Sequence, residues 1–205
     1  MTLTLSIIAL ISAIITIYAK FRDNESWQFI FKPLTMLAII LIAFLNSSAP
    51  MNFYQQAILA GLILSTIGDL FLIKQDRFFV QGLISFLLGH ICFIAAFWTT
   101  PNWLSVIPYL IYIIFFLSIL WKHLGKLKIP VIVYAIALAL MSWMALSRMI
   151  AHHDHHTFHA FVGSIVFVIS DSLLAFNKFK SPIPHAHLWI LATYFLAQWF
   201  IALSV

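Results

Sequence analysis

The sequence predicts an all-α membrane protein, with eight transmembrane helices packed in one bundle as a single transmembrane domain over residues 1–205. Composition supports this first. Hydrophobic residues make up 63% of the chain and charged residues 8%, whereas soluble domains have roughly 45–50% and about 25%. The chain also contains eight apolar runs near the length of about 20 residues that crosses a bilayer. Charged or turn-forming residues separate these runs.

The spans are taken in chain order from the apolar runs. They cover residues 3–20, 31–49, 53–73, 79–98, 103–121, 129–149, 158–177 and 186–204. No Lys or Arg precedes the first run, so it lacks the positive segment of a signal peptide and we expect it to remain as a span. Pro33 and Pro130 fall in predicted first turns, where a missing N–H costs little. Pro108 lies inside the fifth run and predicts a kink there.

Basic residues predict the orientation. Ten of the 11 Lys and Arg residues lie in the first, third, fifth and seventh connections, and only Arg148 belongs to an even-numbered one. Because cytoplasmic connections are enriched in Lys and Arg, we expect these four to be cytoplasmic and both termini non-cytoplasmic. A multi-pass protein of a bacterial inner membrane is expected. The basic residues form no stripe with interleaved aromatics, so nucleic acid is not an expected partner.

Two of the six acidic residues, Asp69 and Asp171, lie inside predicted spans. A carboxylate at mid-helix costs about 2.5–3.5 kcal/mol on insertion scales, which makes such residues functional candidates. Asp69 precedes Lys74 by five residues and Asp171 precedes Lys178 by seven. At a rise of about 1.5 Å per residue, both acids lie roughly 7–10 Å from the cytoplasmic flanks. We therefore expect them at a similar depth, facing one cavity.

A short internal echo relates the two acids. Residues 67–72 and 169–174 have similar sequences, and the third and seventh spans that carry them run in the same direction. Two parallel four-helix halves would explain the echo, although it covers only six residues.

A pair of carboxylates in an apolar cavity suits more than one function. One acid can remain protonated while the other is an ionised base, which favours acid-catalysed hydrolysis. The same pair would serve a proton- or ion-coupled transporter equally well. A structural pair, hydrogen-bonded to the backbone or to His90, is the third alternative.

Several short blocks around the acids carry a family resemblance. They are Lys32-Pro33-Leu34, Ser65-x-x-Gly68-Asp69, Gly82-x-x-x-Phe86-x-x-Gly89-His90, Tyr134, Met141, Gly163-x-x-x-Phe167-x-x-Ser170-Asp171 and Tyr194-x-x-x-Gln198. On these blocks, in order over nearly the whole chain, the sequence resembles the YhhN/TMEM86 family of integral membrane proteins, whose characterised members are lysoplasmalogenases. One departure is Ile91-Cys92-Phe93 after His90, where a tyrosine is common in the family.

The resemblance implies a lysoplasmalogenase, an ether hydrolase that cleaves the vinyl ether bond of a lysoplasmalogen. The products would be a fatty aldehyde and glycerophosphoethanolamine or glycerophosphocholine. Asp69 and Asp171 would be the catalytic acid and base, without a cofactor or a metal. The lysophospholipid substrate would contact Lys32, Ser65, His90, Tyr134, Ser170 and Gln198. A snorkelling anchor is the alternative role of Lys32, and a homodimer is left open.

Five histidines gather around Asp154 in the sixth connection, at positions 152, 153, 155, 156 and 159. Imidazole binds Zn²⁺ and Cu²⁺, but this cluster is expected across the membrane from both acids. We therefore expect an exposed polar loop there rather than a metal site.

Overall fold

The computed structural model describes the backbone of residues 1–205 and every side chain except those of Gln75 and Asp76. The described residues contain eight α-helices and no strand. The helices are α1 (Thr2–Phe21), α2 (Glu25–Asn46), α3 (Phe53–Ile73), α4 (Gln75–Phe97), α5 (Ile107–Leu120), α6 (Lys128–His152), α7 (His155–Phe179) and α8 (Ala186–Leu203). A 3-10 turn, Trp103–Val106, leads into α5. With that turn included, all eight are long and apolar enough to cross a membrane, which confirms the predicted fold class.

Helix ends differ from the predicted spans where the first turns are polar. Helix α2 begins at Glu25 rather than residue 31, because the Asn24 side chain accepts a hydrogen bond from the Trp27 N–H at 3.1 Å and caps the helix. Pro33 therefore lies inside α2, not in its first turn as predicted. Pro108 stands in the first turn of α5, so the predicted kink within that span is wrong.

The histidine-rich connection is also shorter than predicted. Only two residues separate α6 from α7, and Asp154 caps α7 by accepting a hydrogen bond from the Thr157 N–H at 2.7 Å. The expected polar loop is thus mainly two helix ends, with His152 on α6 and His155 on α7. Among the side chains that are described, no group of three His, Cys, Asp or Glu residues is placed to hold a metal ion.

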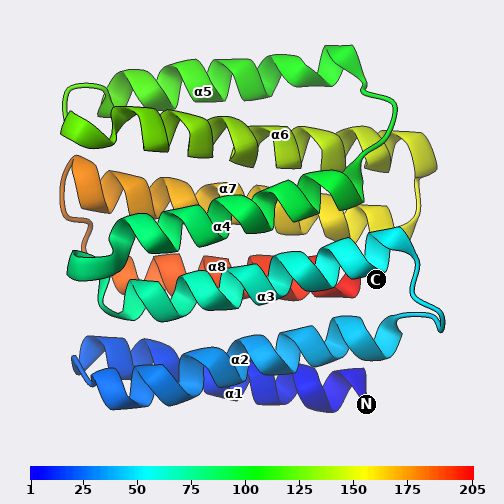
Figure 1. The fold of residues 1–205 in the computed structure, drawn as a ribbon, viewed down its shortest axis with the longest axis horizontal. Coiled ribbons are helices and arrows are strands. Elements are labelled where there is room, and N and C mark those ends of the chain that lie inside the picture. Colours follow the sequence, from blue (N-terminus) through cyan, green and yellow to red (C-terminus); the bar gives the residue numbers. More distant parts are fainter.

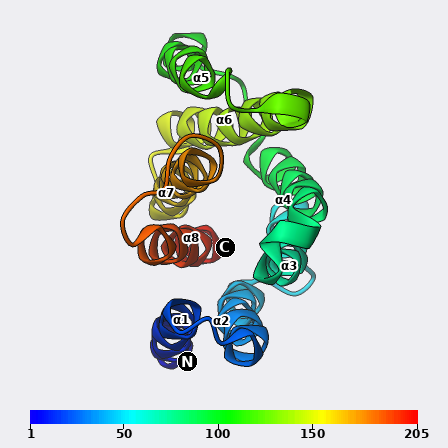
Figure 2. The ribbon, with the colours of Figure 1, turned by 90° about the vertical axis from the view of Figure 1, so that its left-hand side faces the viewer.

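The helices run antiparallel in chain order and enclose a common interior (Figures 1 and 2). Helices α2, α3, α4, α6, α7 and α8 form a closed ring of contacts, while α1 packs outside against α2 and α8, and α5 packs outside mainly on α6. Within the ring, the second half repeats the contacts of the first, since α3 packs on α2 and α4 as α7 packs on α6 and α8, whereas the outer helices α1 and α5 pack differently. This arrangement agrees with two parallel four-helix halves, and Asp69 and Asp171 lie on the corresponding helices α3 and α7.

Both termini lie at the same end of the bundle (Figure 1). The connections α1–α2, α3–α4, α5–α6 and α7–α8 lie at the opposite end. They and the helix ends beside them carry nine of the 11 basic residues, and Lys32 lies two turns further inside α2. The bundle therefore has one strongly basic end.

Glycines bring α3 and α4 into close contact next to Asp69. A Cβ added to Gly68 would lie 2.8 Å from the Phe86 ring, and a Cβ on Gly89 would lie 3.2 Å from the Gly61 carbonyl oxygen. Small residues at such positions let the backbones of two membrane helices approach. The consequence is that Phe86 on α4 reaches the interior beside the acid.

Candidate active site

Asp69 is a fully buried carboxylate whose two oxygens each have a partner. Its Oδ1 lies 2.9 Å from the Lys32 Nζ of α2, and its Oδ2 accepts a hydrogen bond of 2.6 Å from the Tyr194 hydroxyl of α8. The side chains of Asp69 and Lys32 are 2% and 8% exposed. A buried charge is stable only when it is paired and hydrogen-bonded, and this arrangement meets both conditions for an ionised Asp69.

Lys32 points into the bundle. Its Nζ also donates to the backbone oxygen of Asp69 at 3.3 Å, so both of its contacts are with the same residue. This position does not fit the alternative of a snorkelling anchor, which would hold the ammonium group in the interface. Lys32 instead neutralises an acid from inside the ring.

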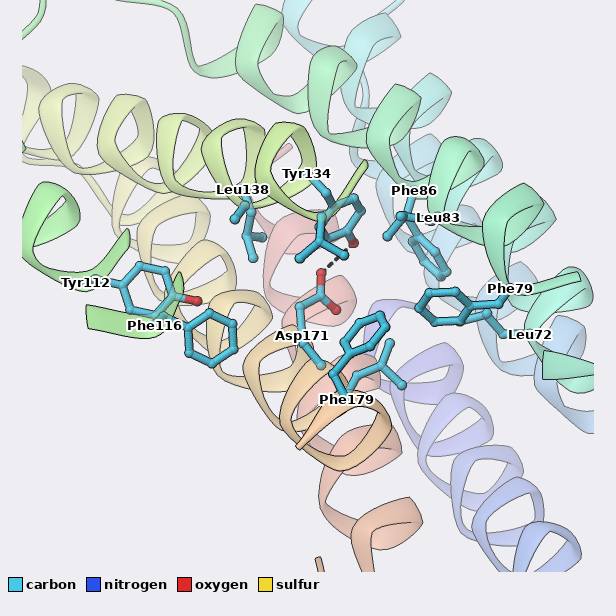
Figure 3. Close-up of a pocket in the computed structure, with 14 residues that line it drawn as sticks. Leu72, Phe79, Leu83, Phe86, Tyr112, Phe116, Tyr134, Leu138, Asp171 and Phe179 are labelled. Atoms are coloured by element: carbon cyan, nitrogen blue, oxygen red, sulfur yellow. Dashed lines mark hydrogen bonds between the residues drawn. The ribbon is translucent and has the colours of Figure 1, made fainter. Parts of the chain in front are cut away.

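Asp171 has a different environment on α7. Its Oδ2 accepts a hydrogen bond of 2.5 Å from the Tyr134 hydroxyl of α6 (Figure 3). Within the part of the chain that the structure describes, Asp171 has no ion pair, and Tyr134 is its one side-chain donor. The two acids therefore differ in their ion pairing, because Asp69 is paired with Lys32 and Asp171 has no ion pair among the described residues.

Both acids line one polar cavity at the basic end of the bundle. Its lining also includes Lys20, Lys32 and Ser170, and its volume is about 60 Å³. One water molecule needs roughly 10–15 Å³, so the cavity has room for water beside both carboxyl groups. We call this space the polar cavity.

A second space lies on the other side of Asp171. We call it the aromatic cavity, and its lining is drawn in Figure 3. It shares Leu72, Phe86, Asp171 and Leu174 with the polar cavity. Asp171 thus stands at the junction of the two spaces.

The other expected substrate contacts fall into two groups. The Ser170 hydroxyl faces the polar cavity but donates to the Ile190 carbonyl at 3.0 Å. Ser65, His90 and Gln198 are buried and line neither cavity. Within the described part of the chain, the Ser65 hydroxyl and both ring nitrogens of His90 have no hydrogen-bond partner. Ordered water is the usual partner of such groups.

His90 packs its ring against Tyr134 and Phe167, at centroid distances of 5.0 and 4.8 Å. It makes no hydrogen bond to either acid among the residues described, so the structural alternative in which His90 holds the acids is wrong. It instead packs edge-on against the ring of Tyr134, whose hydroxyl donates to Asp171.

Tyr194 was not among the site residues predicted from the sequence. It lies four residues before Gln198, on the same face of α8, and that spacing was the available signal. Its ring packs edge-on against Phe86 and Phe167 at 5.8 and 5.7 Å, which directs its hydroxyl at Asp69.

Comparisons with known proteins agree with the expected resemblance. The model of the YhhN family matches residues 27–205. The chain is 33% identical over 190 residues to human Lysoplasmalogenase TMEM86B, covering 89% of this chain and 77% of that protein. It is 34% identical over 158 residues to human Lysoplasmalogenase TMEM86A, covering 72% and 64%. It is 25% identical over 205 residues to a membrane protein YhhN of Escherichia coli O157:H7, covering 95% of both.

No solved structure matches the chain significantly. The match of the family model over residues 27–205, together with 33% identity to a relative over most of both chains, assigns this protein to the YhhN family.

Proposed function

We propose that this protein is a lysoplasmalogenase that hydrolyses the vinyl ether bond of a lysophospholipid with Asp171 as general acid and Asp69 as its ionised partner. The names of the human relatives support the reaction class. The observation that carries the mechanism is the unequal pairing of two acids on one cavity, because Asp69 is bound to Lys32 and Asp171 is not.

The unequal pairing supports different protonation states for the two acids. Ionised Asp69 is balanced by the Lys32 ammonium at 2.9 Å and by the Tyr194 hydroxyl at 2.6 Å. An isolated carboxylate in an apolar site is costly, so the group takes its neutral form instead. Asp171 has no ion pair among the side chains that the structure describes, so in this proposal it is the acid that holds a proton. Two carboxylic acids whose surroundings give them different protonation states can act as a general acid and a general base.

The first step transfers the Asp171 proton to the outer carbon of the vinyl ether double bond. The electron pair of that bond forms the new C–H bond, and the ether oxygen shares its lone pair with the inner carbon to give an oxocarbenium ion. Positive charge develops next to Asp69, whose fixed negative charge stabilises it. The Asp171 carboxylate left behind still accepts the Tyr134 hydrogen bond.

Water from the polar cavity then attacks the inner carbon and gives its proton to the Asp171 carboxylate, which restores the acid. The product is a hemiacetal. It loses the glycerol oxygen as an alcohol when its own hydroxyl proton is transferred to that oxygen, and the remaining carbon becomes the aldehyde. The sum is one vinyl ether and one water consumed, one aldehyde and one glycerophospho-alcohol formed, with no cofactor needed.

The test measures aldehyde release from a lysoplasmalogen by purified protein in detergent. We expect activity in the wild type and a loss of at least about a hundredfold in Asp171→Asn, the lower range for general acid catalysis. Asp69→Asn should also be strongly impaired. Glu25→Gln makes the same chemical change at an exposed acid outside the cavity and should retain wild-type activity.

Full activity in Asp171→Asn would disprove the assigned acid. A folded wild type that releases no aldehyde, but moves protons or ions across proteoliposomes in an Asp69- and Asp171-dependent manner, would favour the coupled transporter instead.

We also infer that the basic end of the bundle is cytoplasmic, as the positive-inside rule requires, in a bacterial inner membrane with both termini on the other side. A Lys126→Cys variant in a Cys92→Ala background should resist membrane-impermeant thiol reagents added outside intact cells. Ready labelling would reverse the orientation.

A further inference from the structure

We propose that the aromatic cavity binds the hydrocarbon chain of the substrate, while its glycerophospho group occupies the polar cavity. This inference rests on the proposed function and adds the direction in which the lipid lies across Asp171. It makes residues of α4, α5 and α6 the determinants of chain selectivity.

The lining of the aromatic cavity suits only hydrocarbon. Its walls come from α3 to α7 and consist mostly of apolar side chains, with three that carry polar atoms: Asp171, Tyr112 and Tyr134. The two tyrosine hydroxyls are already engaged, Tyr112 with Ser172 at 2.8 Å and Tyr134 with Asp171 at 2.5 Å. A phosphate or glycerol group placed there would lose its hydration without a partner, at a cost of several kcal/mol.

The polar cavity has the complementary lining. Lys20, Gln28 and His187 lie on it together with the two acids, and Lys20 and His187 belong to the ends of α1 and α8 that the α1–α2 and α7–α8 connections join. Cationic and amide side chains are the usual partners of a phosphate group. The headgroup of a lysophospholipid therefore fits this side of Asp171 and its chain fits the other.

The position of Asp171 between the two cavities matches the position of the vinyl ether bond in the substrate. In the substrate, the vinyl ether carbons are the first carbons of the hydrocarbon chain, directly next to the glycerol oxygen. In the protein, Asp171 belongs to both cavities and lies between the aromatic side chains of α4 and those of α5 (Figure 3). A lipid that crosses this junction brings its double bond to the proton donor.

A larger groove of about 540 Å³ between α1, α2 and α8 is the rival site. Neither Asp69 nor Asp171 lines it, so a chain lying there would lead away from the acid. The aromatic cavity is narrow, about 40 Å³, and a chain that enters it must displace half-buried lining residues such as Leu83 and Phe116.

The experiment compares kcat/KM for two vinyl ether lysophospholipids with the same headgroup and either an octenyl or a hexadecenyl chain. Leu83→Trp fills the aromatic cavity and should lower the long-to-short ratio of kcat/KM at least about tenfold, the effect of a few methylene groups in an apolar pocket. Leu83→Ala widens the cavity and should raise that ratio.

Two matched control variants test whether the change in the kcat/KM ratio comes from the aromatic cavity. Ile84→Trp adds the same ring at the next position of α4, where the side chain is 52% exposed on the outer face, and Ala13→Trp fills the rival groove. Both should keep the wild-type ratio.

An unchanged ratio in a folded Leu83→Trp would overturn the inference, as would a ratio that changes in Ala13→Trp instead. If Leu83→Trp does not fold, an unchanged ratio in Leu83→Ala overturns it. These results leave the proposed function intact, whereas a wild type inactive on both substrates would remove the function and the inference together.

Discussion

The buried pair between Lys32 and Asp69 should make a large and measurable contribution to both stability and activity. We consider the single variants Lys32→Met and Asp69→Asn and the double variant that carries both changes. Each single change leaves one partner intact in the interior, while the double change removes both charges and keeps similar side-chain volumes.

The structure sets the expected magnitude. At the Nζ–Oδ1 separation of 2.9 Å, Coulomb's law gives an attraction of roughly 6 kcal/mol at an effective dielectric constant of about 20. The cost of burying both charges offsets most of this. Removing one partner leaves the other charge unpaired, which typically costs about 3–5 kcal/mol. The double variant should therefore lose less stability than the two single losses added, with a coupling energy of at least about 2 kcal/mol.

The measurement is reversible unfolding in mixed detergent micelles, followed for the wild type and the three variants. The chain supplies its own control in the Lys74–Glu25 pair, whose charged atoms are 3.7 Å apart and whose side chains are 51% and 56% exposed. A matching cycle of Lys74→Met and Glu25→Gln should give a coupling of only about 0.2–1 kcal/mol.

Measuring aldehyde release for the same four proteins distinguishes an effect on stability from an effect on catalysis. The double variant should fold and remain inactive, because it lacks the ionised Asp69 that the proposed mechanism uses to stabilise the oxocarbenium ion. Additivity of the two single losses within about 0.5 kcal/mol would refute the buried pair, and an active double variant would refute the role of ionised Asp69.

Tyr134→Phe removes the hydroxyl that donates to Asp171 and should lower kcat by about tenfold, the effect of losing one hydrogen bond of roughly 1.5 kcal/mol; a steady-state assay of aldehyde release would measure it. Gly61→Ala places a Cβ 2.3 Å from the buried Phe93 ring and should destabilise the fold by about 1–3 kcal/mol in the same unfolding assay. Asp154→Ala removes the cap of α7 and should cost about 1 kcal/mol at pH 7. The N–H of the third residue of α7 holds the pKa of Asp154 below its usual value, so the cap contributes fully above the unfolded pKa of about 3.9. Its contribution disappears as the pH falls through the lower folded pKa, and the difference between variant and wild type should narrow there.

The helices, and the presence of one acid inside each of two of them, could be predicted because each depends on local sequence. An apolar run of sufficient length predicts a span. An acid within such a run is a functional candidate because placing it in the membrane costs free energy. The helix ends were predicted less well because the apolar criterion does not count polar first turns. The segment from Glu25 to the start of the run is helical because Asn24 caps it, and that signal lies in side-chain chemistry rather than hydropathy.

The partners of the acids could not be predicted because they depend on how distant helices pack and rotate. Lys32 reaches Asp69 from 37 residues away and Tyr194 reaches it from 125 residues away. Sequence periodicity shows which side of each helix is apolar, but it does not show which helices are neighbours in the ring. The sequence therefore predicted two acids at a similar depth without indicating that one of them is paired with a cation.

The repeated architecture explains why that difference matters. Helices α2 and α3 pack in the first half as α6 and α7 pack in the second, and each pair supplies one acid and one donor to it. The donor from α2 is the ammonium group of Lys32, while the donor from α6 is the hydroxyl of Tyr134. Two equivalent halves with identical donors would place two equally charged, or two equally neutral, acids on the cavity. The proposed hydrolysis needs one of each, since a proton must be given and a cation stabilised, so different donors in the two halves would let two similar halves form an asymmetric site.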